Sequence, residues 1–340
     1  SPPVSDETRF ATLGMLAAEA KKKRKRRSAA PVAIAGSSMS RATTPGEPMT
    51  WSPVDAASFS LRGPNYLKDK KKQPSPPALY EPFGSDLLRA SAPVFDVPSR
   101  VVLPPKRPHE LDLPAWLPRI LVQTMYFPGT PPPLLSAGAA RPARRTDRDD
   151  ARGPKGWQVV CYWRVTAETA SAARGDPARW PPHLKLWKQY AQLAETMPVL
   201  NGCLKGVASV DNVHDKDLGL PRLVKQYNAK PVLMAASAVV GERPGVVKIA
   251  KSDDSEYLEF ALDVGTDFAA LSNHALYSMR DTFPKLVLDL GWLVEGRAPD
   301  QLPEGLLACL RVNKVDLAKA VDVDDFFKDA PPNAVPPPDS

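Results

Sequence analysis

Apolar and polar residues alternate along several stretches of the chain, with the period of a strand that buries one face. The alternation is strict over Tyr257–Val264, as in an antiparallel strand with one face in water. Together with Gly245–Lys251, this segment predicts a hairpin across residues 252–255. Further strands are expected over Phe59–Arg62, Arg119–Phe127, Gly156–Thr166, Asn201–Val210, Val232–Val240, Leu286–Val294 and Leu310–Leu317, and Tyr80–Leu88 is expected to be a short strand that runs into a turn of helix.

Two segments instead show the helical period. Pro182–Met197 places Leu184, Trp187 and Tyr190 on one face, and Thr266–Asp281 carries a comparable apolar stripe. Shorter helical turns are expected over Leu218–Asn228 and Leu302–Leu307. Alternating strands combined with amphipathic helices predict an α+β fold, with a curved antiparallel sheet and the two longer helices packed on it. A curved sheet packed around a helix can hold an apolar ligand.

Proline separates this domain from its flanks. The chain has 39 prolines in 340 residues, about twice the usual ~5%, and they cluster outside the apolar segments. We therefore expect a long Pro-rich N-terminal arm over residues 1–49, with a helix over Asp6–Arg27, and one domain over residues 50–321. An Arg/Asp/Pro-rich insertion over residues 128–155 interrupts that domain, and an acidic Pro-rich C-terminal tail covers residues 322–340.

The basic character of the chain is local. The net charge is +7, but one run supplies seven positive charges, and without it 38 basic residues face 38 acidic ones. The folded part is therefore neutral, and nucleic acid is not an expected partner. The run can be a solvated helix end, a contact to anionic lipid or an acidic protein surface, or a nuclear-import signal; it consists of Lys21, Lys22, Lys23, Arg24, Lys25, Arg26 and Arg27.

Motifs that would indicate catalysis are missing from the sequence. It contains no Gly-x-Ser-x-Gly, no P-loop and no His-Glu-x-x-His, and its four histidines are far apart. His109-Glu110 and His214-Asp215 are the only acid-adjacent pairs. The three cysteines lack metal spacing and are expected to be buried free thiols. We therefore expect a protein that is not an enzyme, with no cofactor and no metal site, and the sequence has no apolar run near the ~18 residues of a membrane-spanning helix.

The stretch Trp51–Lys72 begins the domain and carries a second basic cluster. Trp51 and Phe59 are expected to anchor the start of the fold, and Gly63-Pro64-Asn65 ends the first strand. The cluster can be an exposed hairpin tip whose charges block edge pairing. Alternatively, it can contact phosphates or lipid headgroups, and the candidate binding residues are then Arg62, Tyr66, Lys68, Lys70, Lys71 and Lys72.

A set of short blocks, in order along the chain, resembles a known family. The blocks are Trp51-Ser52, Phe59–Arg62, Asn65–Lys72, Leu79-Tyr80, Asp86-Leu87, Tyr257–Glu259, Asp263–Gly265, Leu286–Leu290, Leu293, Glu295-Gly296, Leu302–Glu304 and Leu306-Leu307. From about Thr50 to Leu317 the chain resembles the C-terminal domain of the plant enhanced-disease-resistance-two protein, a family of plants, algae and protists. It departs from the family's usual pattern at Leu204–Ala208 and at the insertion Pro128–Lys155.

The resemblance implies a non-enzymatic domain connected with membrane-associated signalling. We therefore expect a lipid-binding or membrane-surface regulatory module that is intracellular and peripheral to the membrane. The alternative is a structural accessory subunit of a large assembly, held by arms that wrap neighbouring subunits. In that case an organelle, either chloroplast or mitochondrion, is the alternative location, reached after removal of a targeting peptide.

Overall fold

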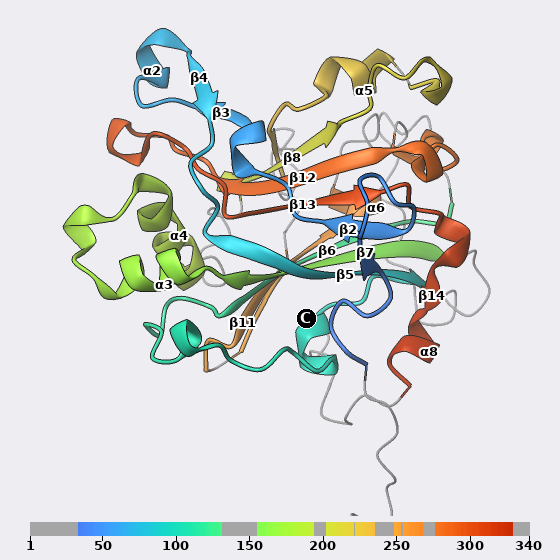
Figure 1. The fold of residues 1–340 in the computed structure, drawn as a ribbon, viewed down its shortest axis with the longest axis horizontal. Helices are drawn as coiled ribbons and strands as arrows, with labels where there is room; N and C mark the ends of the chain where they lie inside the picture. Colours follow the sequence, from blue (N-terminus) through green and yellow to red (C-terminus); the bar gives the residue numbers. More distant parts are fainter. Residues whose placement is uncertain are drawn as a thin grey trace, which may run out of the picture.

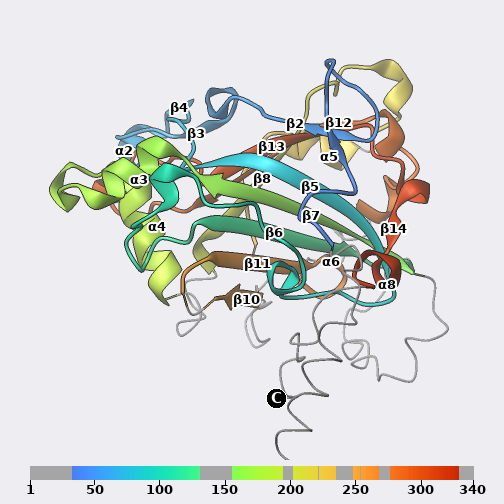
Figure 2. The same cartoon turned by 60° about the horizontal axis from the view of Figure 1, so that its bottom comes forward.

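The chain folds into two curved six-stranded sheets that lie face to face, as Figures 1 and 2 show. The structure is a computed structural model, and it describes residues 33–130, 155–193, 202–220, 222–234, 248–252, 254–267 and 276–328. The predicted α+β class with curved sheets and packed helices is confirmed. Most of the described strands are divided between these two sheets, and some neighbouring strands are parallel, which the alternation pattern could not reveal.

The first sheet, called here the β12 sheet, has its strands mostly antiparallel. Its central strand β12 pairs with β13 on one side and β8 on the other. The order is β1 (Ser40–Arg41), β2 (Thr50–Ser52), β13 (Ala308–Asn313), β12 (Val287–Val294), β8 (Leu204–Val210) and β9 (Val232–Leu233).

The second sheet, the β6 sheet, contains the expected hairpin and also pairs the two strands that flank the insertion. Strands β6 and β7 are antiparallel and flank residues 131–154, and β10 and β11 are antiparallel as predicted. β11 runs parallel to β6. The long stretch of chain between these two strands provides the crossover connection that a parallel pair requires. The order is β10 (Lys248–Lys251), β11 (Tyr257–Asp263), β6 (Ile120–Phe127), β7 (Gly156–Val165), β5 (Tyr80–Ala90) and β14 (Val321–Asp322).

The main core lies between the sheets. Because side chains alternate along a strand, Leu121, Cys161 and Trp163 of the β6 sheet meet Leu310 and Trp292 of the β12 sheet. The opposite face of the β6 sheet has a second core under residues 94–103 and the C-terminal segment. The outer face of the β12 sheet has a third core, formed with residues 54–61 and Leu306.

Helices close one end of the space between the sheets. α3 (Ala167–Arg174) and α4 (Pro182–Leu193) lie together at the left of Figure 1, and α4 contacts β12. The predicted stripe is confirmed, because Leu184, Trp187 and Tyr190 are buried. The other α-helices of the described residues are short: α2 (Tyr66–Asp69), α5 (Arg222–Tyr227), α6 (Val264–Asp267) and α8 (Val323–Phe326). Residues 268–275 of the second predicted helix lie outside the described part.

The stretch Trp51–Lys72 does anchor the fold. Trp51 in β2 and Phe59 are buried, and Phe59 packs against Gly291 of β12. β3 (Ser60–Arg62) and β4 (Lys72–Pro74) form a separate antiparallel pair, and α2 lies between them.

Ordered structure extends beyond residues 50–321 on both sides. On the N-terminal side, the Asp86 carboxylate accepts hydrogen bonds from the backbone of Gly36 and Ser38, at 2.8 and 2.7 Å. Gly36 has φ +75°, and a Cβ there would lie 2.5 Å from the Gly84 Cα, so the two backbones can touch only because both residues are glycine. On the C-terminal side, Phe327 is buried beneath the Arg100 guanidinium.

Two local expectations are wrong. Tyr80–Leu88 contains no helical turn, because β5 continues to Ala90 with an irregularity between Pro82 and Gly84. Leu302–Leu307 is extended instead of helical. Its backbone bonds to neighbouring strands, since the Glu304 N–H donates to the Arg62 carbonyl and the Leu307 N–H to the Trp292 carbonyl.

Candidate ligand-binding cavity

A cavity of about 460 Å³ lies between the two sheets, at the end away from α4. This volume is within the range of small-molecule sites. Among the described residues, its wall is formed mostly by apolar side chains of β6, β7, β8 and β12, together with residues 276–288 and 312–317. None of the described lining residues is Asp, Glu, His, Cys or Ser.

The sequence leaves this space open because small and large residues face each other across neighbouring strands. Trp292 of β12 pairs with Gly206 of β8, and Leu290 pairs with Ala208. A Cβ on Gly206 would lie 2.8 Å from the Trp292 ring, so the indole lies directly over the glycine backbone. Glycine and alanine on β8 thus supply little volume to the wall of the cavity.

Two polar side chains in the wall have no partner within the described structure. Gln123 is 1% exposed, and neither its amide nitrogen nor its amide oxygen is hydrogen-bonded. Trp292 is 2% exposed, and its Nε1–H is likewise unpaired. Both flank Phe260, which is the β11 partner of Gln123 and lies with its ring centroid 5.0 Å from that of Trp292.

Aromatic rings stacked with cations form another part of the wall. The Lys230 Nζ lies 5.6 Å from the centroid of Tyr227, which is 52% exposed. The Arg280 guanidinium lies 4.3 Å from the Tyr277 ring centroid. This part of the wall is therefore both accessible and positively charged.

A polar pocket of about 410 Å³ adjoins the cavity, and Tyr227, Lys230 and Val232 line both spaces. The other residues that line the polar pocket are Arg62, Tyr66, Lys72, Lys205, Pro231, Leu233, Glu295 and Glu304.

Ion pairs neutralise much of the charge in the polar pocket. The Lys205 Nζ is buried, 2.9 Å from a Glu304 oxygen and 3.1 Å from a Glu295 oxygen. Arg62 lies 2.9 Å from Glu295. Burial alone would raise the pKa of Glu295, but hydrogen bonds from Arg297 and Lys205 outweigh it, and the pKa is lowered.

The structure brings together half of the predicted binding residues. Arg62, Tyr66 and Lys72 line the polar pocket, with the Arg62 guanidinium 5.0 Å from the Tyr66 ring centroid. Lys68, Lys70 and Lys71 are exposed at the α2–β4 tip, as the alternative of a charged hairpin tip also predicts. Residues 21–27 lie outside the described part.

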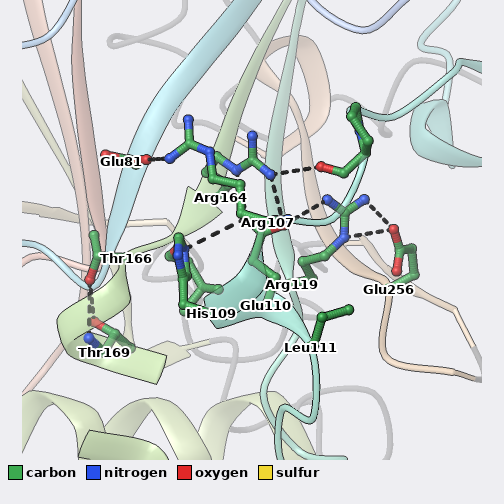
Figure 3. A network of polar contacts seen from close by, with 12 residues as sticks. Glu81, Arg107, His109, Glu110, Leu111, Arg119, Arg164, Thr166, Thr169 and Glu256 are labelled. Atoms are coloured by element: carbon green, nitrogen blue, oxygen red, sulfur yellow. Dashed lines mark hydrogen bonds and ion pairs between the residues drawn. The ribbon is translucent and has the colours of Figure 1, made fainter. Parts of the chain in front are cut away.

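The pair His109-Glu110 belongs to a buried ion network, shown in Figure 3. Glu110 accepts two hydrogen bonds from Arg164, at 2.5 and 2.7 Å, and one from Arg119 at 3.2 Å. Arg119 also bonds Glu256. Burial raises the pKa of Glu110, but the hydrogen bonds from Arg164 and the backbone of Arg107 outweigh it and leave the pKa lowered. With both carboxylate oxygens engaged, this network braces the fold where β6 begins and β7 ends.

The cysteines are free, with Cys161 and Cys309 buried and Cys203 half-buried. Burial raises the pKa of both Cys161 and Cys309 to about 12, so these thiols are neutral and unreactive at ordinary pH. Within the described ranges no three His, Cys, Asp or Glu side chains gather as a metal ion would require. No helix there is long and apolar enough to cross a bilayer.

Sequence reasoning missed the residues that shape the cavity: Gln123, Gly206, Ala208 and Trp292. One signal was present, because Leu121, Gln123, Met125 and Phe127 share a face of a predicted strand and only Gln123 is polar. A lone amide in an inward-facing apolar row marks either a bonded core group or a ligand contact.

The fold and cavity together define an α+β domain of two facing sheets with an internal apolar site. The chain belongs to the family described as Protein ENHANCED DISEASE RESISTANCE 2, C-terminal, which it matches over residues 51–316. The resemblance found in the short sequence blocks is thereby confirmed. No curated protein and no solved structure matches the chain.

Proposed function

We propose that this domain is a non-enzymatic lipid-binding module whose apolar ligand occupies the cavity between the sheets. The cavity itself carries the proposal, since about 460 Å³ of space with an almost wholly apolar described lining suits an acyl or alicyclic body. Each buried methylene contributes about 0.8 kcal/mol, so a chain that enters the cavity gains substantial binding free energy. The described lining holds no Asp, Glu, His, Cys or Ser, the residue types that most often serve as general base or nucleophile, which supports binding without catalysis.

The adjoining polar pocket supports contact with an anionic surface. Lys72 and Lys230 line that pocket, and neither has an ion pair in the described structure. Lys70 and Lys71 are exposed beside Lys72, and each basic residue near an anionic membrane contributes about 1 kcal/mol. In this arrangement the charged end of a lipid meets the lysines, while its apolar part reaches the cavity.

Titration with N-phenyl-naphthylamine, an apolar dye that brightens in an apolar site, tests the cavity in the full chain. Ala208→Trp fills the space, because Ala208 lines the cavity and has an exposed side chain. Ala57→Trp adds the same ring at an exposed position outside the cavity. We expect Ala208→Trp to weaken dye binding at least about tenfold and Ala57→Trp to leave it unchanged. Equal affinity in the two variants would overturn the cavity as the binding site.

Flotation with phosphatidylcholine vesicles, with and without phosphatidylserine, tests the charged surface. Reversing Lys70, Lys71 and Lys72 to Glu should remove most binding to the anionic vesicles. A matched variant reverses three exposed lysines elsewhere, Lys185, Lys216 and Lys319, with the same change in net charge. Equal loss in both variants would show a response to net charge only and would contradict a local headgroup contact.

A further inference from the structure

The cavity wall carries a pair of polar groups that an apolar ligand alone would leave unsatisfied. Burying an unpaired amide or indole N–H is unfavourable by about 1–3 kcal/mol for each group. Gln123 and Trp292 together present three such atoms in a mostly apolar wall. Native proteins keep few groups of this kind without a partner.

The two side chains are held so that they face the same space. Gln123 lies in β6 between Cys161 of β7 and Phe260 of β11. Trp292 lies in the opposite sheet, fixed between Phe260 and the backbone of Gly206. Both residues therefore line the cavity beside Phe260, Gln123 from one sheet and Trp292 from the other.

The hydrogen-bonding capacity of the pair indicates which group fits. The Gln123 amide offers a donor and an acceptor, and the Trp292 Nε1–H offers a donor. A hydroxyl accepts up to two hydrogen bonds and donates one, so it satisfies all three atoms. A carbonyl can accept both but leaves the Gln123 oxygen unpaired, and a hydrocarbon leaves all three unpaired.

An ionised group does not suit this part of the wall. The strand neighbours of Gln123 are Phe260 and Cys161, whose burial raises its pKa to about 12 and keeps it neutral. The cations that line the cavity, Lys230 and Arg280, are stacked on tyrosines of other segments. A carboxylate beside Gln123 would lose its hydration without gaining an opposite charge.

We infer that the ligand is an alcohol, with an uncharged hydroxyl bound between the Gln123 amide and the Trp292 indole and an apolar body in the rest of the cavity. This inference rests on the proposed function and specifies the class of ligand. It predicts that a long-chain or alicyclic alcohol binds more tightly than the fatty acid, ether or alkane of equal length.

Competition against N-phenyl-naphthylamine in the full chain tests the inference. The competitors are dodecanol, dodecyl methyl ether, dodecanoate and dodecane, which differ mainly in the terminal group. We expect dodecanol to bind at least about tenfold more tightly than the other three compounds. Equal affinity for the alcohol and the ether would overturn the inference. Failure to bind any of the compounds or the dye would instead contradict the proposed function.

Variants then assign the preference to the pair. Gln123→Leu and Trp292→Phe remove the polar atoms and keep apolar volume, so each should abolish most of the preference for dodecanol while dodecane still binds. Met125→Leu, in the same inward row and without a polar group, should retain the preference. If Gln123→Leu and Met125→Leu discriminate equally well between alcohol and ether, Gln123 is not the contact. Thermal unfolding of each variant checks that the domain is intact.

Discussion

The two ends of the space between the sheets differ in how they are filled. At the α4 end, Trp187 lies edge-on to Tyr80 and stacks on Tyr190, and the ring centroids are 5.9 and 5.8 Å apart. At the other end, the same two sheets surround a cavity of about 460 Å³. Strand β12 contributes to both, with Val294 in the core near α4 and Leu288 in the cavity wall. The difference therefore lies in the side chains and the helix, since the backbone architecture is shared.

The polar atoms of the large side chains follow the same division. At the α4 end, the Trp187 Nε1–H donates to the Tyr80 hydroxyl, which donates to the Pro118 carbonyl, and the Trp163 Nε1–H donates to the Cys309 carbonyl. Trp180 Nε1 is the exception there. At the cavity end, the Trp157 Nε1–H donates to the Leu317 carbonyl, but Gln123 and Trp292 are unpaired. The filled end thus stabilises the domain, whereas the open end keeps interactions available for a ligand.

Substitution of Glu110 should give the largest loss and should show that the α4 end is braced by charge. Glu110→Gln keeps the shape of the side chain but leaves the buried Arg164 without its anion and the buried Arg119 with Glu256 alone. We expect the free energy of unfolding to fall by about 3–5 kcal/mol. Urea denaturation measures it, and a fall below about 1 kcal/mol would contradict a bracing role.

Matched leucine truncations compare packing at the two ends. Leu184 of α4 is fully buried, so Leu184→Ala should cost about 2–5 kcal/mol of unfolding free energy. Leu288 lies in the cavity wall and is only partly buried, and Leu288→Ala should cost about 1 kcal/mol. Urea denaturation of both variants measures the difference. Equal losses would mean that the cavity end is packed as tightly as the α4 end.

Removal of one polar group from each end should change stability in opposite directions. Tyr80→Phe leaves the Trp187 Nε1–H and the Pro118 carbonyl without partners, so we expect a loss of about 1–3 kcal/mol. Gln123→Leu removes an unpaired buried amide, so we expect a gain of about 1 kcal/mol without ligand. Thermal unfolding measures both variants. A loss on Gln123→Leu would show that its amide is already satisfied.

The pH dependence of stability distinguishes a buried glutamate with a lowered pKa, such as Glu110 beside its arginines, from one with a raised pKa, Glu259. Burial raises the pKa of Glu259 from 4.5 to about 7, and the hydrogen bond from the Thr124 hydroxyl only partly opposes this effect. Between these values the folded state holds a proton that the unfolded chain releases, so stability falls as the pH rises from about 4.5 to about 7. Glu259→Gln should remove this slope, as urea denaturation across the same pH range would show. An unchanged slope would assign it to another group.

The sequence was sufficient to predict most strands, because strict alternation identifies a half-buried strand without any knowledge of its partner. It could not show which strands face one another, and the cavity depends on that: Gly206 and Ala208 indicate a space only when Trp292 and Leu290 are known to pair with them. β5 was predicted too short because its continuation to Ala90 rests on pairing with β7, which is distant in sequence. Three predicted binding residues line the polar pocket: Arg62, Tyr66 and Lys72. The pocket is completed by residues far along the chain, such as Lys230 and Glu304.

Unfolding with and without dodecanol tests whether the open end between the two sheets holds an apolar ligand. A ligand that binds only the folded state at a hundredfold excess over its Kd adds about 2.7 kcal/mol to the free energy of unfolding. We expect this gain in the unaltered chain and in Ala57→Trp, and little or no gain in Ala208→Trp. No gain in the unaltered chain, or the same gain in Ala208→Trp, would contradict it.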